Sequence, residues 1–210
     1  MPKEQVLPLF ASPLFMCQVD DDMDAFYSLL KDESKYPFRP AVEANDSVMS
    51  RDNYILQGLP KLKAILCGHF NRFKDSILRY ESTSVQVTTS WLTKTSRGEH
   101  SAFHTHKNSF FSGVLYFDTI EGGANIEFTN FNVSPRTIDV NPPAERNPYN
   151  SNVISIAVGA NMLLFFPSYL FHRIGTHQAD EPRYSLAFNL LPDGLMSTTA
   201  DSEYHYRHGS

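Results

Sequence analysis

The feature that most constrains the fold is a change in hydrophobic period near Ser82. Before it, apolar residues recur every three or four positions, as on one face of a helix; after it they alternate, as along a half-buried strand. Helices followed by short strands predict an α+β fold with a sandwich or jelly-roll barrel rather than alternating βαβ units. The strand-like runs are Val85–Thr93, Phe110–Phe117, Ala124–Phe128, Val153–Val158, Met162–Phe166, Leu170–Ile174 and Tyr184–Leu191.

Alternation also predicts which side chains of the first run share a face. It places Val85, Val87, Thr89, Trp91 and Thr93 together. The same alternation leads us to expect a closed barrel whose lining excludes water. The lining residues are expected to be Phe103, Phe111, Phe165, Phe166 and Phe188.

Two amphipathic helices are predicted in the first third of the chain. Asp20, Asp21 and Asp22 are suited to cap the first. The apolar faces are Met23, Phe26, Leu29 and Leu30 in the first helix, and Leu59, Leu62, Leu66, Phe70, Phe73 and Ile77 in the second. Upstream, the proline-punctuated run Leu7–Val19 can form one short edge strand at most. We therefore expect one domain over residues 1–210, with helical support in 1–80 and a β core in 82–192.

Composition narrows the class of protein. A chain of 210 residues, 41% hydrophobic and 13% aromatic, can bury a full core. Its formal charge of −5 gives no general attraction to nucleic acid or to an anionic membrane. No run of about 18 apolar residues and no secretory signal is present, so we expect a cytoplasmic protein. Cys17 and Cys67 are too few and too far apart for a disulfide framework or a zinc site, and are expected to be free thiols.

A pair of histidines, His104 and His106, lies in the segment Gly98–Asp118. Side chains at i and i+2 of an extended strand point to the same face, so this pair can supply half of a metal site. With 8 histidines in 210 residues, roughly 0.3 such pairs arise by chance, so the pair alone is a weak signal. Two later residues give it weight: His172, after an apolar run that turns at Pro167, and Arg183, eleven positions further on.

This pattern resembles the double-stranded β-helix oxygenases that use Fe(II) and 2-oxoglutarate. Their pattern is His-x-Asp at a strand end, a distant His on a later strand, and an Arg about ten residues beyond. The chain is most similar to the prolyl-hydroxylase-like branch, in particular to oxygenases of this type from phages and bacteria. The resemblance covers nearly the whole chain. It implies a double-stranded β-helix (jelly-roll or cupin-like barrel) with N-terminal supporting helices, located in the cytoplasm, or in the host cytoplasm if phage-encoded.

The resemblance also implies the activity and the site residues. The expected protein is a hydroxylase-type dioxygenase that uses Fe(II), 2-oxoglutarate, O₂ and a small-molecule or peptide substrate. His104 matches the first histidine of the family and His172 the distal one, while Arg183 matches the residue that pairs with the far carboxylate of 2-oxoglutarate. Tyr116 aligns with a tyrosine that some relatives use to hydrogen-bond that carboxylate, and Ser185 occupies the polar position two after the arginine.

His106 stands where most of the superfamily has Asp. The strand geometry makes it the third ligand, giving a metal set of His104, His106 and His172, and imidazole is a competent ligand for Fe(II). In the alternative, the chain twists out of the strand after His104 and leaves His106 facing the substrate. Two other functions stay open: a three-histidine cupin-type dioxygenase or isomerase that does not use 2-oxoglutarate, and a non-catalytic barrel that serves as a binding module.

Two further expectations concern parts outside the metal set. The segment Thr129–Asn152 is rich in Asn and Pro, and a long insertion of this kind is expected to act as a mobile lid over the metal. The remaining histidines of the β region and the C-terminus are expected on the surface: His100, His177, His205 and His208.

Overall fold

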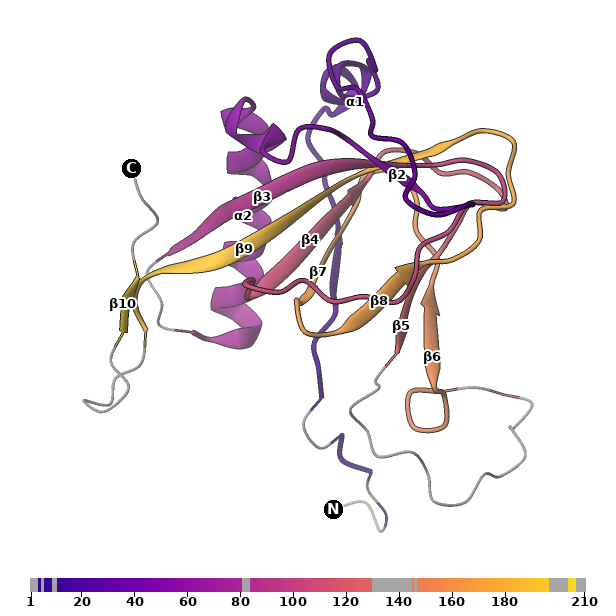
Figure 1. Ribbon diagram of the computed structural model, residues 1–210. Helices are drawn as coiled ribbons and strands as arrows, with labels where there is room; N and C mark the ends of the chain where they lie inside the picture. Colours follow the sequence, from indigo (N-terminus) through magenta and orange to yellow (C-terminus); the bar gives the residue numbers. More distant parts are fainter. Residues whose placement is uncertain are drawn as a thin grey trace.

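The β core consists of two antiparallel sheets, and the helices pack against one of them (Figure 1). The computed structural model describes residues 4, 6–8, 11–80, 84–129, 145, 147–196 and 204–206. Its helical elements are α1 (Asp24–Leu30), the 3-10 turn η1 (Ile55–Gln57), α2 (Pro60–Phe73) and the π turn η2 (Lys74–Leu78). Its strands are β1 (Phe15–Gln18), β2 (Val48–Met49), β3 (Ser84–Thr95), β4 (Phe111–Tyr116), β5 (Ile126–Thr129), β6 (Val153–Ile156), β7 (Met162–Pro167), β8 (Phe171–Ile174), β9 (Arg183–Met196) and β10 (Tyr204–Tyr206).

The chain passes back and forth between the two sheets. The larger sheet has the order β1-β7-β4-β9-β3-β2, with β10 paired to β9, and the smaller has the order β6-β5-β8. This arrangement confirms the predicted double-stranded β-helix. The expectation of a closed barrel is wrong, because no ladder among the described strands joins the sheets. The three strands of the smaller sheet are each four residues long, and β8 also forms an isolated bridge with His104.

One apolar core lies between the helices and the outer face of the larger sheet. The stripe of α2 buries Leu62, Leu66, Phe70 and Phe73, and the Phe70 ring packs edge-on against Phe111 and Phe165. Ile77 leaves the stripe and is 63% exposed, because the π turn η2 changes the helical period. The predicted Asp cap is also wrong: Met23 is the N-cap of α1, and it makes no side-chain capping bond.

A β-bulge divides β3 into two halves with opposite alternation. Val87 pairs with Leu190 and Thr89 with Asn189, so Thr88 is the extra residue between them. Val85 and Val87 therefore pack in the helix-side core, while Trp91 packs between the sheets. The prediction that these three residues share a face is wrong, because strict alternation cannot anticipate the extra residue.

A second apolar core lies between the two sheets. It consists of Val114, Tyr116, Ile126, Phe128, Leu164, Phe166 and Ala187. Of the phenylalanines expected to line the interior, Phe103 belongs to neither core and lies against the Arg173 guanidinium. Phe166 does line the interior, whereas Phe111, Phe165 and Phe188 lie on the helix side. These three point away from the interior because they sit one position out of step with the inward-facing residues of their strands.

The segment expected to act as a lid is Thr129–Asn152. Most of the predicted lid lies outside the described residues, namely 130–144 and 146, so its role stays a prediction.

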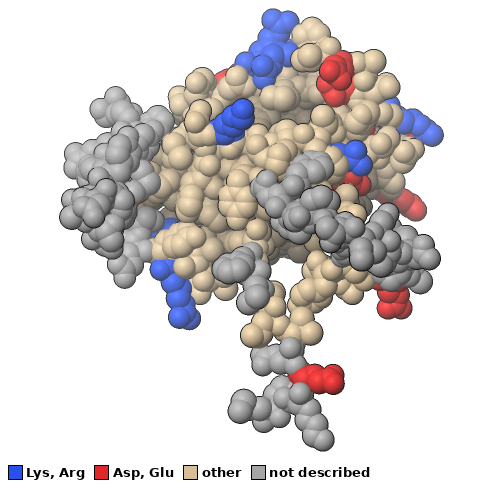
Figure 2. Space-filling view, turned by 60° about the horizontal axis from the view of Figure 1, so that its bottom comes forward, with Lys and Arg blue, Asp and Glu red and all other residues tan. Residues whose placement is uncertain are grey.

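On the face shown in Figure 2, charged side chains lie singly around a largely uncharged centre. Among the described residues, no helix has the length and apolar content needed to span a membrane.

Candidate metal centre

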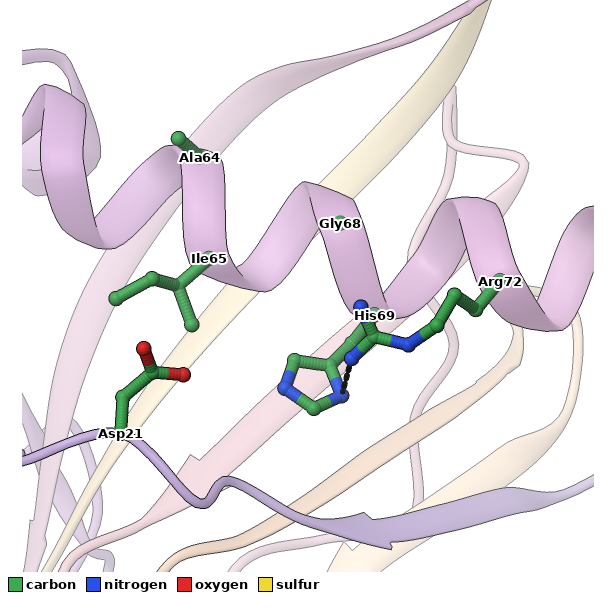
Figure 3. A pocket seen from close by; sticks show the side chains of 6 residues that line it. All are labelled: Asp21, Ala64, Ile65, Gly68, His69 and Arg72. Atoms are coloured by element: carbon green, nitrogen blue, oxygen red, sulfur yellow. Dashed lines mark hydrogen bonds between the residues drawn. The ribbon is translucent and has the colours of Figure 1, made fainter.

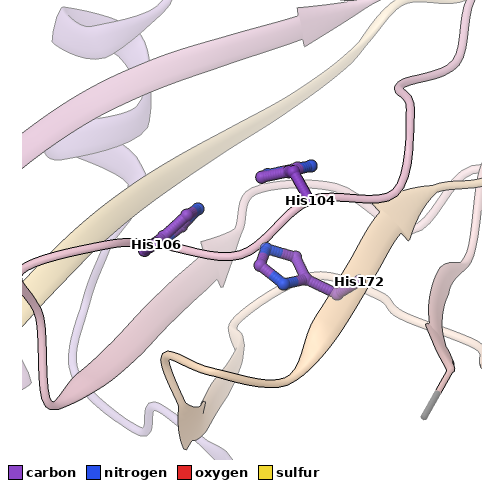
Figure 4. Close-up of side chains that lie close together, drawn as sticks. All are labelled: His104, His106 and His172. Atoms are coloured by element: carbon purple, nitrogen blue, oxygen red, sulfur yellow. The ribbon is translucent and has the colours of Figure 1, made fainter. Parts of the chain in front are cut away.

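Three histidines meet between the end of the extended segment 101–106 and the start of β8 (Figure 4). The backbone of His104 exchanges two hydrogen bonds of 3.0 Å with His172, and the N–H of His106 donates to Ser168 O at 3.0 Å. The segment is thus extended, although it forms an isolated bridge rather than a full strand. His104 and His106 accordingly lie on the same side, as their spacing predicted. The structure does not show the alternative in which His106 turns away.

The hydrogen bonds of the three rings show which nitrogen of each can bind a metal. Nδ1 of His104 lies 2.9 Å from Ala102 O, and Nδ1 of His172 lies 2.9 Å from Leu170 O. Nδ1 of His106 lies 2.7 Å from Asn189 Oδ1. Because these carbonyl oxygens only accept, each Nδ1 carries the proton and each Nε2 keeps its lone pair.

The geometry of the triad fits a single metal ion. One ring nitrogen of each histidine lies within 4.8 Å of the other two. Two nitrogens bound to one metal at about 2.1 Å lie at most about 4.2 Å apart. A small inward rotation of the rings therefore suffices for all three to bind. His172 is buried, His106 half-buried and His104 exposed, so the site opens to solvent on the His104 side.

Burial keeps two of the rings neutral. It lowers the pKa of His106 to about 4, and the neighbouring His104 lowers this pKa further. The hydrogen bond between His106 and Asn189 acts in the opposite direction and raises the pKa. Burial likewise lowers the pKa of His172 to about 3, again with a contribution from His104. Neutral imidazole is the form that binds a metal, so both rings have their ligand form at neutral pH.

Arg183 is buried at the start of β9 with an unpartnered donor. Its side chain is 3% exposed, and Nη1 donates to Ala124 O at 2.6 Å. In the described part of the chain, Nε has no hydrogen-bond partner and no carboxylate pairs with the guanidinium. An uncompensated buried cation is costly, so this pocket suits an anionic guest.

Tyr116 and Ser185 lie beside Arg183 on the interior face of the larger sheet. Tyr116 is buried opposite Ser185 on the adjacent strands β4 and β9. Burial raises the pKa of Tyr116 to about 12, against the opposing effect of Arg183, so the phenol stays protonated and can donate. The three polar side chains form one end of the interior, and β5 runs from there toward the triad, where Phe128 pairs with His172.

His177 is buried, contrary to the expectation that it lies on the surface. It has no exposed area, its Nδ1 accepts from the Ala124 N–H at 3.1 Å, and its Nε2 donates to Glu181 O at 2.7 Å. Both ring nitrogens are used by the backbone, so His177 cannot bind a metal as placed. Its role is to hold Ala124, whose carbonyl receives Arg183. His100 lies outside the metal cluster, and the side chains of His205 and His208 lie outside the described part of the chain.

A shallow groove lies on the opposite side of the larger sheet from the triad (Figure 3). It is lined by Asp21, Ala64, Ile65, Gly68, His69 and Arg72. His69 makes contacts of 2.8 Å with Arg72 and 3.3 Å with Cys17. Both contacts are made by Nδ1, one within α2 and one to β1, so this histidine has a structural role. The groove does not reach the triad.

Two residues that the sequence reasoning did not select also contact the triad. Asn189 and Ser112 both lie within hydrogen-bond distance of Nδ1 of His106. The signal for Asn189 is its even spacing from Arg183, which places both on the interior face of one strand. Likewise, Ser112 lies on the same face of β4 as Val114 and Tyr116, because the three are two residues apart.

Comparison with known proteins agrees with this site. A family model described as "Putative 2OG-Fe(II) oxygenase" matches residues 89–189. The match spans all three histidines, Tyr116, Arg183 and Ser185. Comparison with curated proteins finds no match.

Solved structures share the fold at low sequence identity. A prolyl-4-hydroxylase from Pseudomonas putida is 12% identical, with a TM-score of 0.55 over 86% of this chain and 93% of that one. HygX from Streptomyces hygroscopicus, with nickel, 2-oxoglutarate and hygromycin B bound, is 10% identical, with a TM-score of 0.57 over 95% and 93%. The epimerase SnoN from nogalamycin biosynthesis, in complex with Fe3+ and alpha ketoglutarate, is 11% identical, with a TM-score of 0.65 over 95% and 91%.

Residues 89–189 thus match a model of the 2-oxoglutarate–Fe(II) oxygenases, and the solved structures share the fold of this chain. The cofactors of that class are Fe(II) and 2-oxoglutarate, and the triad is its candidate iron site. Within the class, this chain has a histidine, His106, at the position where the expected pattern has Asp.

Proposed function

We propose that the chain is a hydroxylase-type oxygenase in which His104, His106 and His172 hold Fe(II), and Arg183, Tyr116 and Ser185 hold 2-oxoglutarate. The observation that carries the proposal is the buried Arg183, which faces the same interior as the triad and has no carboxylate partner among the described residues. We also propose that residues 1–210 act as one domain, with helical support in 1–80 and the β core in 82–192.

The residues of the chain supply binding, orientation and exclusion of water. Bound together, Fe(II) and 2-oxoglutarate supply the activation of O₂ for oxidation of the substrate. His104, His106 and His172 would hold the metal through three imidazoles, a ligand number that would keep it accessible to the 2-oxo acid and O₂. At the other end of the cosubstrate, the guanidinium of Arg183 provides a charge-assisted fork for a carboxylate, and the protonated Tyr116 can donate to the same group.

The apolar wall around the triad fits the same role. The ring centroids of Phe166 and His172 lie 4.7 Å apart, and those of Trp91 and His106 lie 5.3 Å apart. Phe128 lies in the same core. These side chains limit water near the metal on the interior side, which strengthens electrostatic interactions with a bound anion.

The substrate class and the reaction subtype are the finer parts of the proposal. The compared structures include a prolyl-4-hydroxylase, an epimerase and an enzyme bound to hygromycin B. We favour hydroxylation of a small-molecule or peptide substrate, in line with the resemblance to the prolyl-hydroxylase-like branch. A cytoplasmic location and a phage source stay predictions.

An anaerobic titration tests the proposal. Adding 2-oxoglutarate to the Fe(II)-loaded protein should produce a new visible absorption band, because the 2-oxo acid chelates the iron. Glutarate, which lacks the 2-oxo group, should compete for binding and produce no band. An unchanged spectrum with a full complement of iron would instead favour a three-histidine dioxygenase or isomerase that does not use 2-oxoglutarate. A protein that retains no metal would favour a non-catalytic binding module, the alternative that His106 suggests.

A further inference from the structure

We propose that Asn189 is a positioning residue that fixes His106 in the tautomer with its proton on Nδ1, so that Nε2 faces the metal. The metal-binding part of this inference rests on the proposed function, while the tautomer can be measured in metal-free protein. In the other two histidines of the triad, Nδ1 bonds to a backbone carbonyl: His104 to Ala102 O and His172 to Leu170 O. His106 depends on a side chain instead.

The contacts of His106 define the tautomer. Asn189 Oδ1 lies 2.7 Å from Nδ1, a distance that requires a proton between the two atoms, because an amide oxygen only accepts. Ser112 Oγ lies 2.8 Å from the same nitrogen. A hydroxyl can donate as well as accept, so Ser112 alone would permit both tautomers. Asn189 is therefore the contact that distinguishes them.

In the structure the Asn189 amide presents its oxygen to His106. Its Nδ2 donates to Thr89 Oγ1 at 3.0 Å, and Thr89 faces the interior because the bulge at Thr88 reverses the alternation of β3. A flipped amide would turn Nδ2 toward His106 and would require the Thr89 hydroxyl to donate to Oδ1 instead, so the tautomer of His106 also reports the orientation of this amide. The bulge thus acts on the metal site through Thr89 and Asn189.

A directed chain of hydroxyls keeps Ser112 from donating to His106. Ser109 Oγ donates to Phe111 O at 3.1 Å, and Ser168 Oγ donates to Ser109 Oγ at 2.8 Å. Ser112 Oγ has two acceptors for its own proton, Ser168 Oγ at 2.8 Å and Asn189 Oδ1 at 3.0 Å. The single Ser112 proton goes to one of these acceptors, so Oγ is left to accept from Nδ1–H of His106. This is the tautomer that the Asn189 contact also requires.

The test compares Asn189→Leu with Asn189→Asp. Leucine removes the acceptor and keeps a similar volume, whereas aspartate keeps an acceptor oxygen in the same place. Nitrogen-15 NMR of the metal-free protein at neutral pH should show His106 as the Nδ1–H tautomer in the parent and in Asn189→Asp. A mixture of tautomers is expected in Asn189→Leu. Thermal unfolding of each variant checks that it is folded, and Thr89→Val offers a milder change that should also allow a mixture.

Metal binding gives the second readout. Loss of such a supporting hydrogen bond typically weakens metal binding by about 10- to 100-fold. Co(II) titration should therefore show a loss of that size in Asn189→Leu and little loss in Asn189→Asp. An Nε2–H tautomer in the parent, or an unchanged tautomer and affinity in Asn189→Leu, overturns the inference while leaving the proposed function intact. If His106→Ala binds Co(II) as well as the parent, the ligand role of His106 fails, and the NMR result still decides the role of Asn189.

Discussion

The guanidinium of Arg183 lies over the ring of Tyr116, with Cζ 5.1 Å from the ring centroid. Both side chains are almost fully buried, and both point into the space between the sheets. The aromatic face offsets part of the cost of burying the cation, but it does not replace a hydrogen-bond acceptor for Nε. Nε is therefore the atom of this pair that the carboxylate of the proposed cosubstrate would satisfy.

Replacing Arg183 should weaken binding of 2-oxoglutarate without releasing the metal. Loss of one charge-assisted bidentate pair in a cleft costs on the order of 2–4 kcal/mol, so Arg183→Ala should bind 2-oxoglutarate at least tenfold more weakly. Calorimetry with the metal present measures the change. Arg97→Ala is the matched control, since Arg97 is 63% exposed and pairs with Asp180 on the surface. Equal affinity in Arg183→Ala and the parent would exclude this arginine as the cosubstrate anchor.

Substitutions of His106 should change metal retention in opposite directions. His106→Ala removes one ligand and should bind Fe(II) more weakly than the parent. His106→Asp places a negative charge beside a dication, and should bind Fe(II) more tightly. Metal analysis after dialysis measures retention, with His100→Ala as a control outside the cluster. An X-ray absorption spectrum showing no nitrogen lost in His106→Ala would contradict the ligand role.

The metal-free protein should lose stability as the pH falls below the ordinary range of histidine. The folded-state pKa values of His106 and His172 are about 4 and about 3, whereas an unfolded imidazole titrates near 6.5. Between these values the unfolded chain binds more protons, so acid favours unfolding and stability is restored as the pH rises.

Thermal unfolding with a chelator present, from pH 7.5 to pH 5, tests this prediction. The midpoint should fall with pH, and the fall should be smaller in His106→Gln, which lacks one of the two groups. A midpoint independent of pH over this interval would show that the buried rings do not titrate as described.

Gly113→Ala should destabilise the fold without a direct effect on the metal. A Cβ at this position would lie 2.3 Å from Phe188 Cζ, on the helix side of the larger sheet. Overpacking of this kind costs about 1–3 kcal/mol, measurable by urea unfolding. In the Phe188→Leu background the same substitution should cost less, because the ring edge is gone. An equal cost in both backgrounds would mean that the ring is not what excludes the methyl group.

The positions of most strands along the chain could be predicted from the sequence, whereas their order within the sheets was not. Alternation located the core strands within a few residues, and the stripe of α2 identified the face that packs on the sheet. The bulge at Thr88 and the π turn at Lys74–Leu78 could not be predicted in this way. Each inserts or shifts one residue through local backbone geometry, while the apolar pattern on either side still looks regular.

The residues of the candidate site were predicted better than the residues that hold them in place. The spacing of His104, His106, His172 and Arg183 carries a chemical pattern, and the structure brings the three histidines together while burying the arginine. Asn189 and His177 were missed because their roles depend on which backbone atoms or rings lie opposite them. Such partners belong to strands distant in sequence, and a polar residue in a strand gives no sign of them.

The contacts of Ala124 imply that some substitutions with functional effects will be far from any ligand. Its N–H is held by His177 and its carbonyl receives Arg183, so a single residue, Ala124, links the placement of the two side chains. A mutational scan scored by turnover alone would group His177 with Arg183, although both ring nitrogens of His177 bond to backbone atoms of the described residues. Measuring protein abundance alongside turnover would separate residues that bind the cosubstrate from those that hold its binding site in place.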